Sequence, residues 1–156
     1  MKRLIGFVWR AAPKRLKRGG VWLVEPRFMV TAGMVVIDDA GRVLLLKHVF
    51  RRGSGWGIPG GFLEKREQPE EAVRRELHEE AGLEVDRLEL ITARTLKRPQ
   101  QVELLYRCRV CAGSRAEARS LEIKAAAWFA PDDLPPELGR DQRRLIERAL
   151  ASDARR

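Results

Sequence analysis

The segment 51–82 constrains the fold more than any other part of the chain, because an irregular stretch leads directly into a helix with clear end signals. Residues 51–61, RRGSGWGIPGG, contain five glycines and one proline, a composition that predicts a loop. Residues 69–81 begin with a proline and two glutamates, which suit the first turn of a helix, and Gly82 suits a left-handed cap after its end. Gln68 is a poorer N-cap than Ser, Thr or Asp. The sequence therefore predicts a helix over 69–81.

The rest of the chain alternates apolar and polar residues in short runs that predict strands. These predicted strands cover residues 28–37, 42–50, 88–96, 102–110 and 125–129. The turn residues at 38–41 predict that the first two strands form a hairpin. A terminal helix is predicted over 137–151, with Leu145, Ile146 and Leu150 on its buried face.

Three glutamates share one face of the predicted helix 69–81. Glu76, Glu79 and Glu80 fall within an arc of about 100°, because spacings of three and four residues return to the same side of a helix. Like charges at this spacing repel and raise one another's pKa, so a bound cation is one explanation for the cluster. The alternative is a solvated acidic face that pairs with Arg74 and Arg75.

Oxygen ligands of this kind favour a hard divalent ion, Mg²⁺ or Mn²⁺, that completes its shell with water and substrate phosphate. Such an ion neutralises a diphosphate and activates a bound water. The preceding glycines allow close approach of the backbone, so the carbonyl of Gly60 is a further candidate ligand. Glu67 can pair with Arg75 if the loop folds back, and this pair would orient the glutamates.

The spacing of these residues closely resembles the Nudix box, G-x5-E-x7-R-E-U-x-E-E-x-G-U, in which U is aliphatic. The box runs from Gly61 through Glu67 to the sequence RELHEEAGL at 75–83, and every fixed position matches. Pro59 and Gly60 before it are also typical of the family. The resemblance implies an α/β fold, a Nudix-type α/β/α sandwich with a mixed sheet and a catalytic loop-helix, over roughly residues 28–152.

The resemblance also implies an activity: hydrolysis, with Mg²⁺ or Mn²⁺, of a nucleoside diphosphate linked to another moiety. By position, Glu79 and Glu80 resemble metal ligands, and Glu76 resembles a ligand or the group that positions water. Arg75 and Glu67 resemble the family's supporting pair. Glu122 lies in a segment, LEIKAAAWF, similar to one that supplies an additional glutamate in some members; it is either a ligand or general base, or a surface carboxylate. Glu103 is the weaker candidate for this role.

Two box-flanking positions depart from the pattern of many members. Arg66 stands where glycine is frequent, and Gln68 stands where Ser or Thr is frequent. These departures affect the loop geometry and the helix cap rather than the acidic residues. His78 occupies a variable box position and is interpreted as a solvated helix residue.

Residues outside the box select the substrate in this family. Trp56 and Phe50 are candidates to stack on a base or sugar, and Arg51 and Arg52 are candidates to pair with phosphate. Trp56 can equally fill the core beneath the loop. The stretch GWGIPGGFLE is similar to members that act on ADP-ribose-like or NDP-sugar substrates. Oxidised dNTPs, diadenosine polyphosphates and RNA 5′ ends remain open.

The chain has 156 residues and a net charge of +9, which indicate one compact domain with an affinity for polyanions. Residues 1–26 hold seven lysines and arginines before the first acid, predicting a basic N-terminal extension ahead of a domain over 27–156. The extension is either a phosphate-binding or membrane-surface arm, or a docked helix or solvated tail. No apolar run is long enough for a transmembrane segment, so a cytoplasmic location is expected. A homodimer is an expectation from the family alone.

Other classes of function have weaker support. Cys108 and Cys111 form C-x-x-C, but a zinc site needs four ligands and the two histidines are not suitably placed, so ordinary strand cysteines are favoured. A nucleic-acid-binding protein remains an alternative, although no RNA-recognition motif is present. A noncatalytic nucleotide-binding module is another, which the intact glutamates argue against. A Walker-type ATPase is excluded because the sequence contains no Gly-Lys-Ser/Thr.

Overall fold

The computed structural model describes residues 13, 25–51, 53, 55–97, 100–110 and 115–153. Nearly all of the predicted basic extension, together with Arg52 and Cys111, lies outside these residues. The described elements are seven strands and two helices. The strands are β1 (Met29–Ile37), β2 (Val43–His48), β3 (Trp56–Gly57), β4 (Gly60–Phe62), β5 (Val85–Leu96), β6 (Gln101–Val110) and β7 (Ile123–Phe129); the helices are α3 (Pro69–Ala81) and α4 (Arg140–Asp153).

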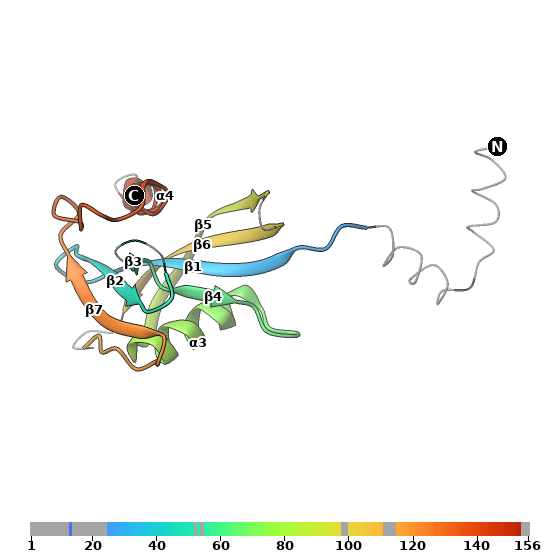
Figure 1. The fold of residues 1–156 in the computed structure, drawn as a ribbon, viewed down its shortest axis with the longest axis horizontal. Coiled ribbons are helices and arrows are strands. Elements are labelled where there is room, and N and C mark those ends of the chain that lie inside the picture. The colour runs from blue at the N-terminus through green and yellow to red at the C-terminus, as the bar shows by residue number, and fades with distance from the viewer. Residues whose placement is uncertain are drawn as a thin grey trace.

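The strands form one mixed sheet in the order β3-β2-β1-β6-β5, and β4 and β7 pair with β1 and β2, respectively. β1 runs parallel to β6 along its whole length and antiparallel to β2 and β4. Helix α3 covers one side of the sheet and α4 covers the other (Figure 1). This arrangement confirms the predicted α/β sandwich with a mixed sheet.

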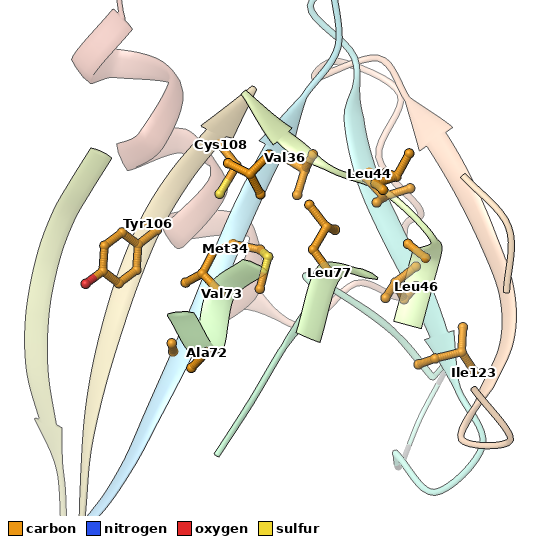
Figure 2. Packing of buried hydrophobic residues seen from close by; sticks show 14 residues of the cluster. Met34, Val36, Leu44, Leu46, Ala72, Val73, Leu77, Tyr106, Cys108 and Ile123 are labelled. Carbon is orange, nitrogen blue, oxygen red and sulfur yellow. The ribbon is translucent and has the colours of Figure 1, made fainter. Parts of the chain in front are cut away.

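The first core lies between α3 and the sheet. Val73, Leu77 and Ala81 from the helix are fully buried against alternate residues of β1, including Met34 and Val36. Figure 2 shows Val73 and Leu77 of the helix beside Met34 and Val36 of β1. The glutamates lie next to this apolar stripe on the surface of α3. Packing of the stripe against the sheet therefore fixes the direction in which the glutamates face.

The second core lies on the other face of the sheet, beneath α4. Val35 and Ile37 alternate with the first-core residues along β1 and pack with Leu145 and Ile146 of α4. Leu150 packs against the same cluster. The predicted buried face of the terminal helix is therefore confirmed.

Several predicted boundaries were wrong. The prediction that residues 51–61 form only a loop fails at β3 and at the start of β4, because two- and three-residue strands depend on pairing with β2 and β1 and leave no local periodicity. β5 and β7 begin earlier than predicted. Helix α4 begins at Arg140 rather than at residue 137, since the Leu138 N–H donates to the carbonyl of Pro135 in a turn that precedes the helix.

No helix in the described ranges is long and apolar enough to cross a membrane. Cys108 is fully buried on β6, and burial raises the pKa of its thiol to about 12. This thiol is protonated at neutral pH, the behaviour of an ordinary strand cysteine.

Candidate active site

Helix α3 has the bounds that the sequence predicts, and its two ends show why. The Gln68 backbone N–H donates to Oε2 of Glu71 at 2.9 Å, so a glutamate of the first turn compensates for the weak cap residue. Gly82 adopts a left-handed conformation with φ of 67°, and its N–H donates to the carbonyl of His78. Both ends of the helix that carries the acidic residues are therefore fixed by local hydrogen bonds.

A cavity of about 400 Å³ opens beside α3 and gathers three of the predicted glutamates. Glu76 and Glu80 line it from the helix, Glu122 lines it from the segment before β7, and Gly60 and Gly61 line it from β4. Glu79 does not line this cavity, and its side chain is 57% exposed. The structure thus brings together Glu76, Glu80 and Glu122, while Glu79 lies at the outer edge of the same helix face.

Glu80 is the most buried of these carboxylates, with a relative exposure of 9%. Burial raises its pKa to about 7; a hydrogen bond from the Gly60 N–H at 3.1 Å opposes the shift, and the charges of Glu76 and Glu122 add to it. Burial likewise raises the pKa of Glu76. The carboxylates of Glu76 and Glu80 are therefore destabilised as anions, and a bound cation would stabilise them.

Arg75 is held against the acidic face by the predicted partner. Its Nε donates to Oε1 of Glu67 at 2.7 Å and its Nη2 donates to Oε2 at 3.0 Å, which confirms that the loop folds back onto the helix. This pairing holds the pKa of Glu67 at about 2. Nη1 of Arg75 in turn donates to Glu76 at 2.8 Å and to Glu79 at 3.3 Å. Arg75 therefore connects Glu67 to Glu76 and Glu79 through hydrogen bonds.

The departure at Arg66 has a structural counterpart. Arg66 is the one non-glycine residue with positive φ among the described residues, at 72°. Glycine adopts this conformation without strain, whereas any other L-residue pays for contact between its Cβ and the backbone. The loop keeps its shape here because the Glu64 N–H donates to Oε2 of Glu67 and the Glu67 N–H donates to the carbonyl of Glu64.

Two neighbouring segments hold the remaining wall of the cavity. The carbonyl of Glu122 accepts a hydrogen bond from the Val49 N–H at 2.8 Å, which joins it to the end of β2. Before it, Glu117 and Arg119 donate their N–H groups to the carbonyls of Ala81 and Glu80 at the end of α3. The chain between β6 and β7 thus satisfies helix carbonyls that would otherwise lack partners.

The donor chemistry of the cavity fits a hard divalent ion. Glu76, Glu80 and Glu122 offer only oxygen, and burial already disfavours the anionic forms of Glu76 and Glu80. Within the described residues, no three His, Cys, Asp or Glu side chains converge closely enough to hold one ion. Glu76 bonds Arg75 and Glu80 bonds the Gly60 N–H instead. Gly60 contacts the acidic cluster through its N–H, and ligation by its carbonyl stays a prediction.

Arg51 lies where a substrate phosphate is predicted to bind. It lines the acidic cavity and also a smaller adjoining cavity. Burial lowers its pKa, and the carboxylates of Glu80 and Glu103 act against that shift. Phe50 is 80% exposed, and its stacking role stays a prediction. Arg52 lies outside the described residues.

Trp56 packs against the second core, and its stacking role stays a prediction. Its ring packs edge-on against Phe129 with centroids 5.2 Å apart, and Lys47 lies over its face. It lines neither cavity beside α3. The aromatic residue that lines both is Phe62, which is not among the site residues predicted from the sequence. The position of Phe62 directly after the box glycines is the feature of the sequence that could have identified it.

His48 is a second residue at the site that was not predicted from the sequence. It lines the acidic cavity from the end of β2, and its Nε2 is buried without a hydrogen-bond partner in the described structure. Burial lowers its pKa to about 4, the charge of Arg51 adds to the shift, and a hydrogen bond with the Ile58 backbone opposes it. The imidazole is therefore neutral at physiological pH.

Comparison with known proteins gives one family. A model of the NUDIX domain matches residues 27–149. A MutT-like protein from Streptomyces ambofaciens is 37% identical over 112 residues, which are 70% of this chain and 68% of that protein. The NAD-capped RNA hydrolase NudC of Citrobacter koseri is 33% identical over 120 residues, 76% of this chain but 46% of that protein, so the chain spans about half of its length. The crystal structure of a MutT NUDIX hydrolase from Burkholderia pseudomallei matches with a TM-score of 0.64 and 29% identity, covering 79% of this chain and 98% of that chain.

Proposed function

Because this chain belongs to the Nudix family of pyrophosphohydrolases, we propose that it hydrolyses the pyrophosphate bond of a nucleoside diphosphate linked to another moiety. The observation that carries the proposal is the cavity lined by Glu76, Glu80 and Glu122, in which the Glu80 carboxylate is buried and its pKa is raised. The products would be a nucleoside monophosphate and the phosphorylated second moiety.

Glu76, Glu80 and Glu122, with Glu79 and the Gly60 carbonyl, are the residues that would hold Mg²⁺ or Mn²⁺. When bound, the ion would supply charge neutralisation for the diphosphate and a lowered pKa for a bound water. Glu76 and Glu122 are the candidates to accept a proton from the attacking water. Arg75, fixed by Glu67, keeps the Glu76 carboxylate in position. Arg51 would bind a phosphate oxygen at the junction of the two cavities.

The favoured substrates are ADP-ribose-like compounds and NDP-sugars. This choice is supported by the likeness of the stretch GWGIPGGFLE to family members with such substrates, and by the small polar cavity that adjoins the acidic one. We also propose that residues 27–156 form the catalytic domain and that it acts in the cytoplasm as a homodimer.

The test is a hydrolysis panel of ADP-ribose, NADH, NDP-sugars, dNTPs and diadenosine polyphosphates with Mg²⁺ or Mn²⁺. We expect release of a nucleoside monophosphate from one of them and a loss of at least about 100-fold in Glu80→Gln. Glu84→Gln is the matched control, because Glu84 is exposed and pairs with His78 away from the cavity. Failure to cleave any compound, with titration calorimetry detecting no metal uptake, would contradict the proposal.

A second candidate is hydrolysis at the 5′ end of RNA. The net charge of +9 and the similarity to the NAD-capped RNA hydrolases support it. The same panel distinguishes it when NAD-capped RNA is added beside free NADH. Preference for the capped RNA, weakening steeply as salt rises, would favour this candidate. Nucleotide or RNA binding without turnover would instead favour a noncatalytic module.

A further inference from the structure

The smaller cavity lies on the sheet face that α4 covers, opposite the glutamates of α3. Thr31 and Glu103 face it from paired positions on β1 and β6, and Gln142 faces it from α4. Its volume is about 160 Å³. At ~30 Å³ for each water molecule, this is room for roughly five waters, the size of a small polar moiety such as a pentose ring.

The two cavities meet at β4. Gly60, Gly61, Phe62 and Arg51 line both of them. A substrate whose diphosphate lies at the α3 glutamates would therefore cross the glycines of β4 and place a neighbouring moiety on the α4 side. The residues that line the smaller cavity are then in a position to select that moiety.

Glu103 is the charged acceptor of the smaller cavity, and it is held in place. Its Oε2 accepts a hydrogen bond from Nε of Arg94, the residue directly opposite on β5. Arg94 is fixed in turn by two hydrogen bonds to Asp141 of α4, at 2.7 and 2.6 Å. The Glu103 side chain is only 15% exposed, and its Oε1 is not used in the bond to Arg94. A carboxylate fixed in this way offers a rigid acceptor.

The other polar groups of the cavity are partly engaged. The Gln101 amide donates to the hydroxyl of Thr31 at 2.6 Å, and the Gln142 carbonyl oxygen accepts the Ile58 N–H at 2.9 Å. An ionised carboxylate only accepts hydrogen bonds, so its ligand must present donors. Neighbouring hydroxyls of a sugar are donors of the right kind, and hydrogen bonds to a charged acceptor are stronger than those between neutral groups.

We propose that Glu103 is a specificity-determining residue that accepts hydrogen bonds from the sugar hydroxyls of the nucleotide substrate. Arg94 and Asp141 are positioning residues that aim its carboxylate into the smaller cavity. The inference rests on the proposed function, because the sugar reaches this cavity only when the diphosphate lies at the α3 glutamates. This role of Glu103 predicts that the protein prefers substrates derived from ribonucleotides to deoxynucleotides.

The experiment measures binding of AMP, 2′-deoxy-AMP, 3′-deoxy-AMP and IMP by titration calorimetry in the presence of Mg²⁺. The wild type should bind AMP at least about 10-fold more tightly than one of the two deoxy compounds. Glu103→Gln should reduce that preference to within about twofold, and Asp141→Asn should reduce it partly. IMP tests whether Glu103 reads the amino group of the base instead of the sugar.

Glu89→Gln is the matched control. Glu89 and Arg107 form the equivalent ion pair across β5 and β6, and neither residue lines the two cavities of the site. Both glutamate variants should lower the melting temperature by similar amounts, whereas only Glu103→Gln should change nucleotide preference. A purely structural role for Glu103 predicts no such difference.

Equal affinity of the wild type for AMP and both deoxy compounds would overturn the inference. So would a preference for AMP that survives Glu103→Gln, or a preference for AMP over IMP that Glu103→Gln alone removes. Absence of AMP binding would overturn it as well. Hydrolysis of ADP-ribose is scored separately. A protein that cleaves ADP-ribose but shows unchanged preferences in Glu103→Gln retains the proposed function and loses this inference.

Discussion

The Cα of Gly61 lies directly against the carboxylate of Glu76, so that a Cβ added to Gly61 would lie 2.1 Å from Oε1 and 2.3 Å from Cδ of the glutamate. A side chain at this position therefore requires the Glu76 carboxylate to move. The requirement for glycine at the start of the box is therefore steric, because the backbone of β4 has to lie next to an acidic residue of α3. Gly61 itself does not have positive φ.

Gly61→Ala should displace the Glu76 carboxylate and lower kcat/KM by about 100-fold, since small misplacements of reacting groups have effects of this size. The fold should survive because alanine tolerates the backbone conformation. Gly139→Ala is the control, as nothing lies within 4 Å of a Cβ added there. Steady-state kinetics and melting temperatures check the prediction, and an active Gly61→Ala enzyme would contradict it.

Glu67→Gln should lower metal affinity or activity by about 10- to 100-fold, the usual effect of removing a group that orients metal ligands. The change leaves Arg75 with a neutral partner and frees it to approach Glu76 and Glu79 more closely. Calorimetric titration with Mg²⁺ together with steady-state kinetics measures the effect. Glu84→Gln should behave like the wild type in both assays; equal losses in the two variants would point to a general charge effect.

The pKa of Glu80 predicts a pH dependence of stability. It is about 7 in the folded protein and 4.5 in the unfolded chain, so between these values the folded state keeps a proton that the unfolded state has released. This group therefore lowers the free energy of unfolding as the pH rises through that window. His48 acts in the opposite direction, because its pKa falls from 6.5 to about 4 on folding.

The comparison of wild type with Glu80→Gln isolates the glutamate. Urea unfolding of the chelator-treated proteins should show that the variant gains stability relative to the wild type between about pH 5 and about pH 8. A difference that stays constant over this range would contradict the pKa assignment. Added Mg²⁺ should stabilise the wild type more than the variant at the higher pH.

Arg66→Gly should stabilise the protein by up to about 1 kcal/mol. The substitution relieves the left-handed conformation of Arg66, and the greater flexibility of glycine in the unfolded chain offsets part of the gain. Lys65→Gly is the control next to it, where positive φ is not required and glycine should destabilise. Urea unfolding of both variants gives the comparison, and a loss of stability in Arg66→Gly would show that the arginine side chain has a compensating contact.

Trp56→Ala should lower the free energy of unfolding by about 2 kcal/mol or more, because the ring packs on Phe129 in the second core. The KM should stay unchanged, because the ring lines neither cavity of the site. Urea unfolding and substrate titration separate the two effects. A raised KM with unchanged stability would support the stacking role that the sequence also allows.

Local signals explain which elements were predictable. The ends of α3 follow from residues next to them in the chain, and the Glu67–Arg75 contact follows from box spacing once the loop folds back. β3 and β4 were not predictable, since they exist only through pairing with β2 and β1. Their pairing depends on the complete sheet.

The residues of the candidate site were also predictable only in part. Glu76 and Glu80 were found because helical spacing and the box identify them, and Glu122 was found through its segment. The separation of Glu103 from these residues was not predictable, because strand alternation places it on the opposite face of the sheet, where Arg94 neutralises it. The choice between the two interpretations of Trp56 also required the position of Phe129, which is distant in sequence.

The hydrogen bonds from Glu117 and Arg119 to the last carbonyls of α3 have a consequence for how the protein is made. On the ribosome, α3 emerges well before these two residues, so its final turn stays without those partners until the polypeptide has grown past β6. Glu80 belongs to that turn. A nascent chain that stops short of Arg119 would therefore lack these hydrogen bonds to the last turn of α3, and truncated products should be inactive even though the box itself is complete.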